Sequence, residues 1–240
     1  MDNQLAVKIR AIASVPRLGF NDHFGCMNDT LGKFGIPIAW YTGAFWEKCI
    51  EAAIEDSLKD VDWLLTLDYD TLATPQHLVR MLETFGKNPH IDALAANQPR
   101  RGTGMPLWTI RGKQGRVELD GPIQASTAHF GFTLLRASSL RDLPKPWFFP
   151  VAAEDGSCRG KGHIDADIAF WKRWEAAGKT LFIEPSVCIG HIEAMVSMFE
   201  QKENPDGSLE ISQTFITCPE WRKRFSGSGG MASLGEQETR

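Results

Sequence analysis

The sequence predicts an α/β protein with a mixed, mostly parallel central sheet flanked by helices. Two observations predict it. In the first hundred residues, short apolar runs alternate with amphipathic stretches, as in successive strand and helix units. The run before Asp68 is continuously apolar, as is typical of a parallel strand buried on both faces. A length of 240 residues suits one large domain, so we assign residues 1–225 to a single domain and 226–240 to a flexible tail.

The first elements follow from apolar runs and breaks between them. Residues 7–15 read as a strand that ends at Pro16-Arg17-Leu18-Gly19. Residues 21–33 predict a helix, and residues 36–41 predict a second apolar strand. Residues 45–58 predict a helix because their apolar and charged side chains fall on opposite faces. The strand that ends on Asp68 comes next.

Thr74-Pro75 marks the start of the next helix, since it combines an N-cap residue with proline at the first helical position. Residues 91–96 form the fourth predicted strand. The Gly-, Arg- and Pro-rich residues 97–123 predict a hairpin excursion. The later elements are expected to be strand 129–136, a short helix 138–143, helix 165–177 with Gly178 at its C-cap, strands 180–184 and 187–190, and a turn at 205–207.

Composition indicates a soluble globular protein, with 42% hydrophobic and 23% charged residues. A net charge of -4 argues against a broad nucleic-acid-binding surface. Five scattered cysteines without a Cys-x-x-Cys pair indicate reduced thiols and a cytoplasmic location. No apolar run approaches the roughly 20 residues of a membrane span, and the N-terminus lacks a signal-peptide pattern. The sequence leaves the oligomeric state open.

The strongest indication of function is the pair Asp68 and Asp70. Ligands of open α/β sheets bind beyond the carboxyl ends of the strands, and this pair follows such an end. In an extended chain, side chains two residues apart face the same side, so both carboxylates could reach one hard cation. The structural alternative is a turn at the strand end, with Asp70 capping the next helix.

The order of motifs resembles that of nucleotide-sugar-dependent glycosyltransferases of the GT-A (Rossmann-like) fold, family 2-like. Their Asp-x-Asp motif is matched by Asp68-Tyr69-Asp70. Their strand near a glycine is matched by residues 129–136, their acidic helix start before a phenylalanine by residues 165–170, and their aliphatic strand with a terminal histidine by residues 187–191. The resemblance spans about residues 5 to 195. It implies a nucleotide-sugar donor, with UDP-sugars favoured, and a glycan, protein, small-molecule or modified-nucleobase acceptor.

The resemblance also implies a Mn²⁺ or Mg²⁺ ion that neutralises the departing diphosphate. Asp70 would be a direct ligand, Asp68 a ligand or a contact to the ribose or to metal-bound water, and His191 the third protein ligand. An imidazole among hard ligands favours Mn²⁺. Alternatively, His191 is a hydrogen-bonded core or edge histidine.

The resemblance places a catalytic base at the start of the helix that contains Asp165 and Asp167. Asp167 aligns better with the acid of inverting enzymes, although Ala166 stands where those enzymes usually have glutamate. Asp165 could be an N-cap, and either carboxylate is stabilised there by the helix dipole. A retaining enzyme would need no such base.

The resemblance also implies donor contacts at the ends of the first two strands, because the nucleotide lies over that edge of the sheet in the family. The expected donor-binding residues are Pro16, Arg17, Thr42, Lys48, Tyr69, Gln98 and Gly131. Glycine at position 131 would permit close approach of the donor sugar, or could mark a strand kink. Trp108, Trp147 and Phe148 are candidate stacking platforms for the acceptor.

Two other functions fit parts of the pattern. Asp68-Tyr69-Asp70-Thr71 also resembles the motif of haloacid-dehalogenase-like phosphatases, with Asp68 as nucleophile, but Leu72 stands where that motif has Thr or Val. A catalytically inactive module that binds nucleotide sugars or glycans is the other alternative, since fold does not guarantee activity.

Overall fold

The computed structural model describes residues 7–15, 19–102, 105–110, 121–217 and 220. The chain divides into two compact units, Met1–Ile192 and Glu193–Arg240. This division comes earlier than the predicted domain end at residue 225, because β10 (Met195–Glu203) and β11 (Leu209–Thr217) form a separate two-stranded sheet. The predicted tail, residues 226–240, lies outside the described residues.

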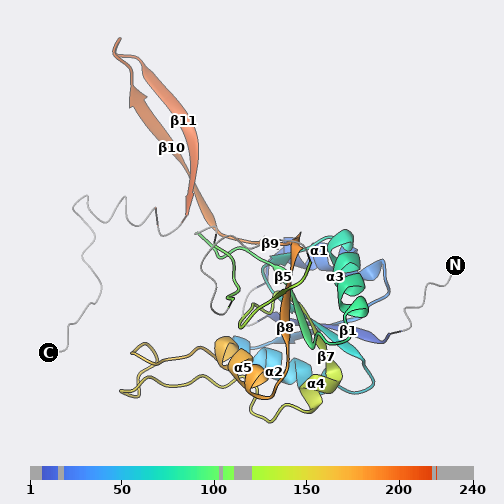
Figure 1. The fold of residues 1–240 in the computed structure, drawn as a ribbon. Helices are drawn as coiled ribbons and strands as arrows, with labels where there is room; N and C mark the ends of the chain where they lie inside the picture. The colour runs from blue at the N-terminus through green and yellow to red at the C-terminus, as the bar shows by residue number, and fades with distance from the viewer. Residues whose placement is uncertain (1–6, 16–18, 103–104, 111–120, 218–219, 221–240) are drawn as a thin grey trace. The chain divides into compact units, whose positions relative to one another are not determined.

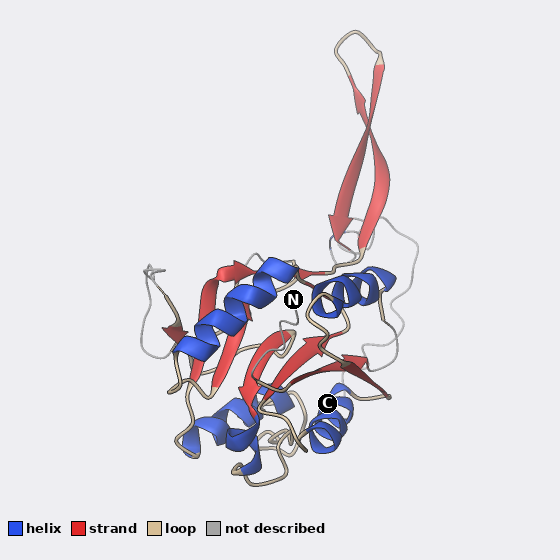
Figure 2. Ribbon diagram, turned by 90° about the vertical axis from the view of Figure 1, so that its right-hand side faces the viewer, coloured by secondary structure: helices blue, strands red, loops and turns tan. Residues whose placement is uncertain are grey.

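The first unit is built on a seven-stranded sheet in the order β2-β1-β3-β7-β5-β8-β6 (Figures 1 and 2). Its strands are β1 (Ile9–Val15), β2 (Ile38–Thr42), β3 (Trp63–Asp68), β5 (Ala93–Asn97), β6 (Ile123–Gln124), β7 (Phe132–Arg136) and β8 (Leu181–Cys188). β1 runs parallel to β2 and β3, and β5 runs parallel to β8. β7 is antiparallel to both β3 and β5, and β6 is antiparallel to β8. The predicted mixed, mostly parallel sheet is therefore confirmed.

Helices cover both faces of this sheet (Figure 1). α1 (Asn21–Gly32) and α3 (Pro75–Lys87) pack on one face, and α2 (Trp46–Ser57), α4 (Ala137–Arg141) and α5 (Ala166–Ala176) pack on the other. Neighbouring side chains of β3 pack on opposite faces of the sheet. Leu64 packs with α2, α4 and α5, and Leu65 packs with α1 and α3. Burial on both faces explains why this strand is continuously apolar.

The predicted start of α3 is confirmed in detail. The Thr74 hydroxyl accepts a hydrogen bond from the backbone N–H of His77 at 3.3 Å, and His77 Nδ1 accepts one from the backbone N–H of Thr74 at 3.3 Å. Pro75 occupies the first helical position, where no backbone donor is needed. Gly178 follows α5 with φ of +72°, as expected of a C-cap glycine.

The end of the sheet differs from the prediction. Residues 181–188 form one strand rather than two, because pairing with β5 continues past a register shift between Ala96 and Asn97. After it, β9 (Gly190–His191) pairs with β4 (Thr71–Leu72) in a small separate sheet.

The second unit is the hairpin of β10 and β11, which the sequence indicated only through its turn. No helix in the described part of the chain has the length and hydropathy of a membrane span. None of the four described cysteines, Cys26, Cys49, Cys158 and Cys188, forms a disulfide.

Candidate active site

A pocket of about 590 Å³ opens where β3 and β5 end. This is the sheet edge at which open α/β sheets bind ligands. Its walls come from six places in the chain: the first residue of α2, the turn after β3, the segment after β5, the residues before β7, the first turn of α5, and β9. The lining residues are Trp46, Asp68, Tyr69, Asp70, Gln98, Arg100, Arg101, Pro106, Leu107, Trp108, Thr109, Thr127, Ala128, His129, Phe130, Asp167, Ile168 and His191.

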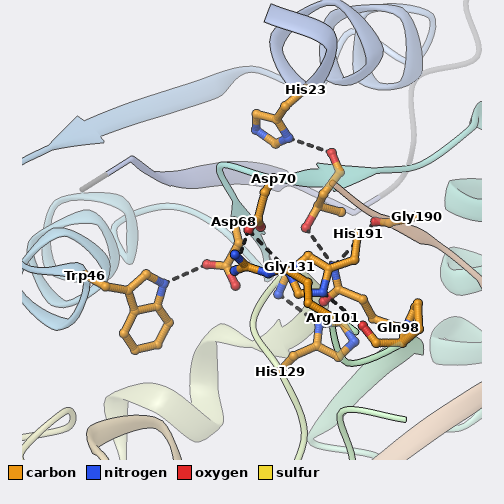
Figure 3. Close-up of polar contacts among 12 residues, drawn as sticks. His23, Trp46, Asp68, Asp70, Gln98, Arg101, His129, Gly131, Gly190 and His191 are labelled. Atoms are coloured by element: carbon orange, nitrogen blue, oxygen red, sulfur yellow. Dashed lines mark hydrogen bonds and ion pairs between the residues drawn. The ribbon is translucent and has the colours of Figure 1, made fainter. Parts of the chain in front are cut away.

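Asp70 and His191 meet in this pocket (Figure 3). The pairing of Thr71 with His191 between β4 and β9 brings them together, and Asp70 Oδ2 lies 3.3 Å from His191 Nε2. His191 Nδ1 donates to the Pro99 carbonyl at 2.9 Å, which leaves Nε2 of the neutral ring with a lone pair that can accept a hydrogen bond or bind a cation. Burial lowers the pKa of His191, but the hydrogen bonds that the protonated ring makes to Asp70 and Pro99 outweigh burial and leave the pKa above its ordinary value.

Asp68 has a different environment. Its Oδ1 accepts a hydrogen bond from Trp46 Nε1 at 2.7 Å (Figure 3). Burial raises the pKa of Asp68 to about 7, with the charge of Asp70 adding to the rise and the Trp46 bond opposing it.

Of the three expected metal ligands, the structure therefore brings Asp70 and His191 together and holds Asp68 against Trp46. Among the described residues, no group of three or more His, Cys, Asp or Glu side chains is arranged to hold a metal ion. A carboxylate oxygen and an imidazole nitrogen with a fixed tautomer nevertheless suit Mn²⁺ in donor chemistry, and both line the pocket. These two residues thus fit a divalent ion.

Arg101 is a further site residue, and the sequence analysis did not identify it as a partner of Asp70 and His191. Its Nη2 lies 2.8 Å from Asp70 Oδ2, and its Nε donates to His191 Nε2 at 3.0 Å. The available signal was the Arg100-Arg101 pair a few residues after the fourth strand. His129 was also missed, but its role is structural. Its Nε2 donates to the Ala96 carbonyl at 2.7 Å, and burial lowers its pKa to about 4, so the ring is neutral.

The two candidate bases occupy different positions at the start of α5. Asp167 lines the pocket, and burial raises the pKa of its carboxyl. The Asp165 side chain is 78% exposed and pairs with His163 at 3.1 Å. Asp165 is the residue before the helix, but its side chain makes no capping hydrogen bond.

Only some of the expected donor-binding residues line the pocket. Tyr69 and Gln98 line the pocket, whereas Thr42 and Lys48 are exposed and do not contribute to its lining. Pro16 and Arg17 lie outside the described residues. Tyr69 stacks on Phe20, with ring centroids 6.1 Å apart.

Gln98 and Gly131 help to hold the site together. Gln98 is buried, and its Nε2 donates to the Thr71 hydroxyl at 3.3 Å. A Cβ added at Gly131 would stand 2.6 Å from that hydroxyl and 2.7 Å from Gln98 Oε1. The backbone at Gly131 thus packs closely against Thr71 and Gln98.

Of the three candidate acceptor platforms, Trp108 lines the pocket and donates through Nε1 to Asn97 Oδ1 at 3.0 Å. The prediction for Trp147 and Phe148 was wrong. Each is 3% exposed and belongs to the core beneath α2 and α5, where aromatic side chains gain most from burial.

No protein-family model and no curated protein matches the chain. Solved structures do match its fold. A197 from STIV shares 16% identity over 83% of this chain and 92% of that one, with a TM-score of 0.52. GalNAc-T7, solved with UDP, GalNAc and Mn²⁺, shares 11% identity over 80% of this chain, with a TM-score of 0.51. The match spans 44% of the GalNAc-T7 chain, less than half of its length. The chain therefore has a GT-A-type fold, as predicted.

Proposed function

We propose that this protein is a metal-dependent glycosyltransferase that moves a sugar from a nucleotide sugar, with UDP-sugars favoured, to an acceptor. The observation that carries the proposal is the Asp70–His191 pair, in a pocket that Asp167 also lines, at the ligand-binding edge of a GT-A-type sheet. The GalNAc-T7 structure, which has a similar fold, contains UDP and Mn²⁺, and this supports the choice of donor and metal.

Asp70 and His191 would hold the ion, and Asp68 would be a further ligand or a contact to the ribose. A bound Mn²⁺ or Mg²⁺ neutralises charge that develops on the leaving diphosphate. The Pro99 carbonyl keeps His191 in the tautomer that leaves Nε2 available. Tyr69 and Gln98, which line the pocket, would lie beside the donor. Gly131, Pro16, Arg17, Thr42 and Lys48 stay predictions for donor contacts.

Asp167 would take the proton from the acceptor hydroxyl in an inverting reaction, with exposed Asp165 as the weaker candidate. Burial raises the pKa of Asp167, which moves it toward working pH and makes it a stronger base. Trp108 offers an aromatic surface for a sugar or a base, so a glycan, protein, small molecule or modified nucleobase all fit as acceptor.

Calorimetry with UDP, GDP and CDP donors, with and without Mn²⁺, tests the proposal on wild type and Asp70→Ala. We expect micromolar, metal-dependent binding of one donor class that Asp70→Ala abolishes. Asp142→Ala, which removes an exposed carboxylate after α4, is the matched control and should bind as wild type does.

The other outcomes separate the alternatives. Absence of binding to every donor would contradict the proposal, and release of phosphate from a generic phosphomonoester would then favour the phosphatase. Donor binding without transfer or hydrolysis, across acceptors of all four classes, would indicate the inactive binding module.

A further inference from the structure

The positively charged guanidinium of Arg101 contacts both members of the Asp70–His191 pair. Arg101 contacts Asp70 Oδ2 through Nη2 at 2.8 Å and His191 Nε2 through Nε at 3.0 Å (Figure 3). We propose that Arg101 and a divalent metal ion are alternative occupants of this site, so that metal binds only when the Arg101 side chain has left. This inference rests on the proposed function, because it assumes that Asp70 and His191 bind a divalent ion.

The two occupants exclude each other because they use the same atoms. A metal ion would be bound through Asp70 Oδ2 and His191 Nε2, the oxygen and nitrogen that face each other in the pair. The guanidinium donates its hydrogen bonds to these same two atoms. A divalent cation and a guanidinium would also repel each other strongly if both contacted these atoms inside a partly dehydrated pocket.

The pair is fixed and Arg101 is free to rotate away. The side chains of Asp70 and His191 are 3% and 10% exposed, and the pairing of β4 with β9 holds their backbones. The Arg101 side chain is 47% exposed and extends from an irregular segment after β5. Gly102, which follows it, has φ of +67°, in the region that glycine adopts without strain. The cost of turning Arg101 outward is therefore the loss of its two contacts.

This arrangement lowers the apparent affinity for metal. If only a fraction of molecules have Arg101 turned away, the apparent dissociation constant equals the intrinsic one divided by that fraction. A guanidinium at the rim of this pocket is suited to pair with an anion such as a diphosphate. A nucleoside diphosphate would thus favour the open position of Arg101, and metal and donor would bind cooperatively.

Mn²⁺ titration followed by electron paramagnetic resonance, without any donor, tests the inference. Removing Arg101 by Arg101→Ala should tighten Mn²⁺ binding by on the order of tenfold, the effect of a charge-assisted contact of modest strength. Arg101→Lys, which keeps the charge but lacks the planar guanidinium fork, should fall between the two. Lys87→Ala is the control, because it removes one exposed positive charge from α3, outside the lining of the pocket. Its Mn²⁺ affinity should change by less than about twofold, as expected for screened charge at a distance.

Two further measurements keep the result interpretable. The double variant Asp70→Asn with Arg101→Ala should lose Mn²⁺ binding, which assigns the ion to this pair. Adding UDP should tighten Mn²⁺ binding more in wild type than in Arg101→Ala. Circular dichroism verifies folding, and Arg101→Gln replaces the alanine variant if the latter does not fold.

Equal or weaker Mn²⁺ binding by Arg101→Ala, with wild type binding the ion, would overturn the inference and leave the proposed function intact. Absence of Mn²⁺ binding in every variant would overturn both the inference and the metal dependence of the proposed function. In that case a loss of UDP binding in Arg101→Ala would show that the guanidinium itself serves the diphosphate.

Discussion

Asp68 and Asp70 show how strongly the environment of a single residue decides its chemistry. Asp68 is the last residue of β3 and is held by Trp46, which α2 positions. Asp70 lies in the following turn and faces His191 and Arg101. The sequence identified both acids, but their partners come from positions 22 to 121 residues away along the chain. Those partners could not be read from local spacing.

The raised pKa of Asp167 predicts a pH profile for transfer. A general base acts when deprotonated, so activity should fall as pH drops through this raised pKa, above the value of about 3.9 for an ordinary aspartate. Asp167→Asn should lower kcat by about 10²–10⁴-fold, the usual contribution of a general base. It should leave donor affinity unchanged. Measurement of kcat against pH checks both expectations.

Asp165→Asn is the control for this prediction, since it removes an exposed carboxylate from the same helix start. If Asp167→Asn kept the wild-type kcat and pH profile and Asp165→Asn lost activity instead, Asp165 would be the base.

Gly131 should tolerate no larger residue. A Cβ in Gly131→Ala would lie 2.6 Å from Thr71 Oγ1 and 3.1 Å from His129 Nδ1, so the polar groups behind the site must shift. We expect a loss of about 1–3 kcal/mol in the free energy of unfolding, as for other overpacked sites. Urea denaturation measures it. Gly25→Ala is the control, because a Cβ there meets nothing within 4 Å, and a similar loss in both variants would contradict the packing argument.

At the scale of elements, Glu184 joins β8 to α3. Its carboxylate is fully buried, accepts a hydrogen bond from the Thr84 hydroxyl at 2.6 Å, and lies 3.5 Å from Arg80 Nε. Burial raises the pKa of Glu184, but the bonds from Ser186 and Thr84 and the charge of Arg80 outweigh it. The net pKa is below its ordinary value of 4.5. The sequence predicted the strand and the helix but not this connection, because the partners are 100 residues apart.

Because the pKa of Glu184 is lowered in the folded state, the fold should lose stability at acid pH. A lowered pKa in the folded state stabilises the fold above about pH 4.5, and the contribution is lost as pH falls through the folded pKa. Glu184→Gln should cost about 1–3 kcal/mol at pH 7, because it weakens charge-assisted hydrogen bonds. The difference from wild type should shrink below pH 4.5. Urea denaturation at pH 7 and at a pH below 4.5 measures this difference. Glu83→Gln, on the exposed side of α3, is the control and should show neither the loss at pH 7 nor its dependence on pH.

At the scale of the whole molecule, the second unit differs from the first in how it is stabilised. The register of β10 with β11 places five apolar side chains on one face of the hairpin: Met195, Phe199, Leu209, Ile211 and Phe215. Each of them is more than half exposed. Ile216 is the one buried residue among the hairpin side chains that the structure describes, and a two-stranded hairpin with so little burial is only marginally stable by itself.

Amide hydrogen exchange should distinguish the two units. Peptides from residues 195–217 should exchange much faster than peptides from β3 and β5, whose side chains are buried on both faces. Mass spectrometry of the intact chain measures both in one sample. Protection of the hairpin equal to that of the sheet would contradict this expectation, and would show that its apolar face is covered in solution.

The sequence by itself determined most of the strands and helices of the first unit, the N-cap of α3, and the acids at the end of β3. These features depend on residues close together in the chain, such as Thr74, Pro75 and His77 at one helix start. Only the tertiary structure decided that Asp70 meets His191 and Arg101 and that Trp46 holds Asp68. It also decided that Trp147 and Phe148 are core residues. Contacts between distant segments depend on how the whole sheet twists and packs, and no local pattern of residues records that.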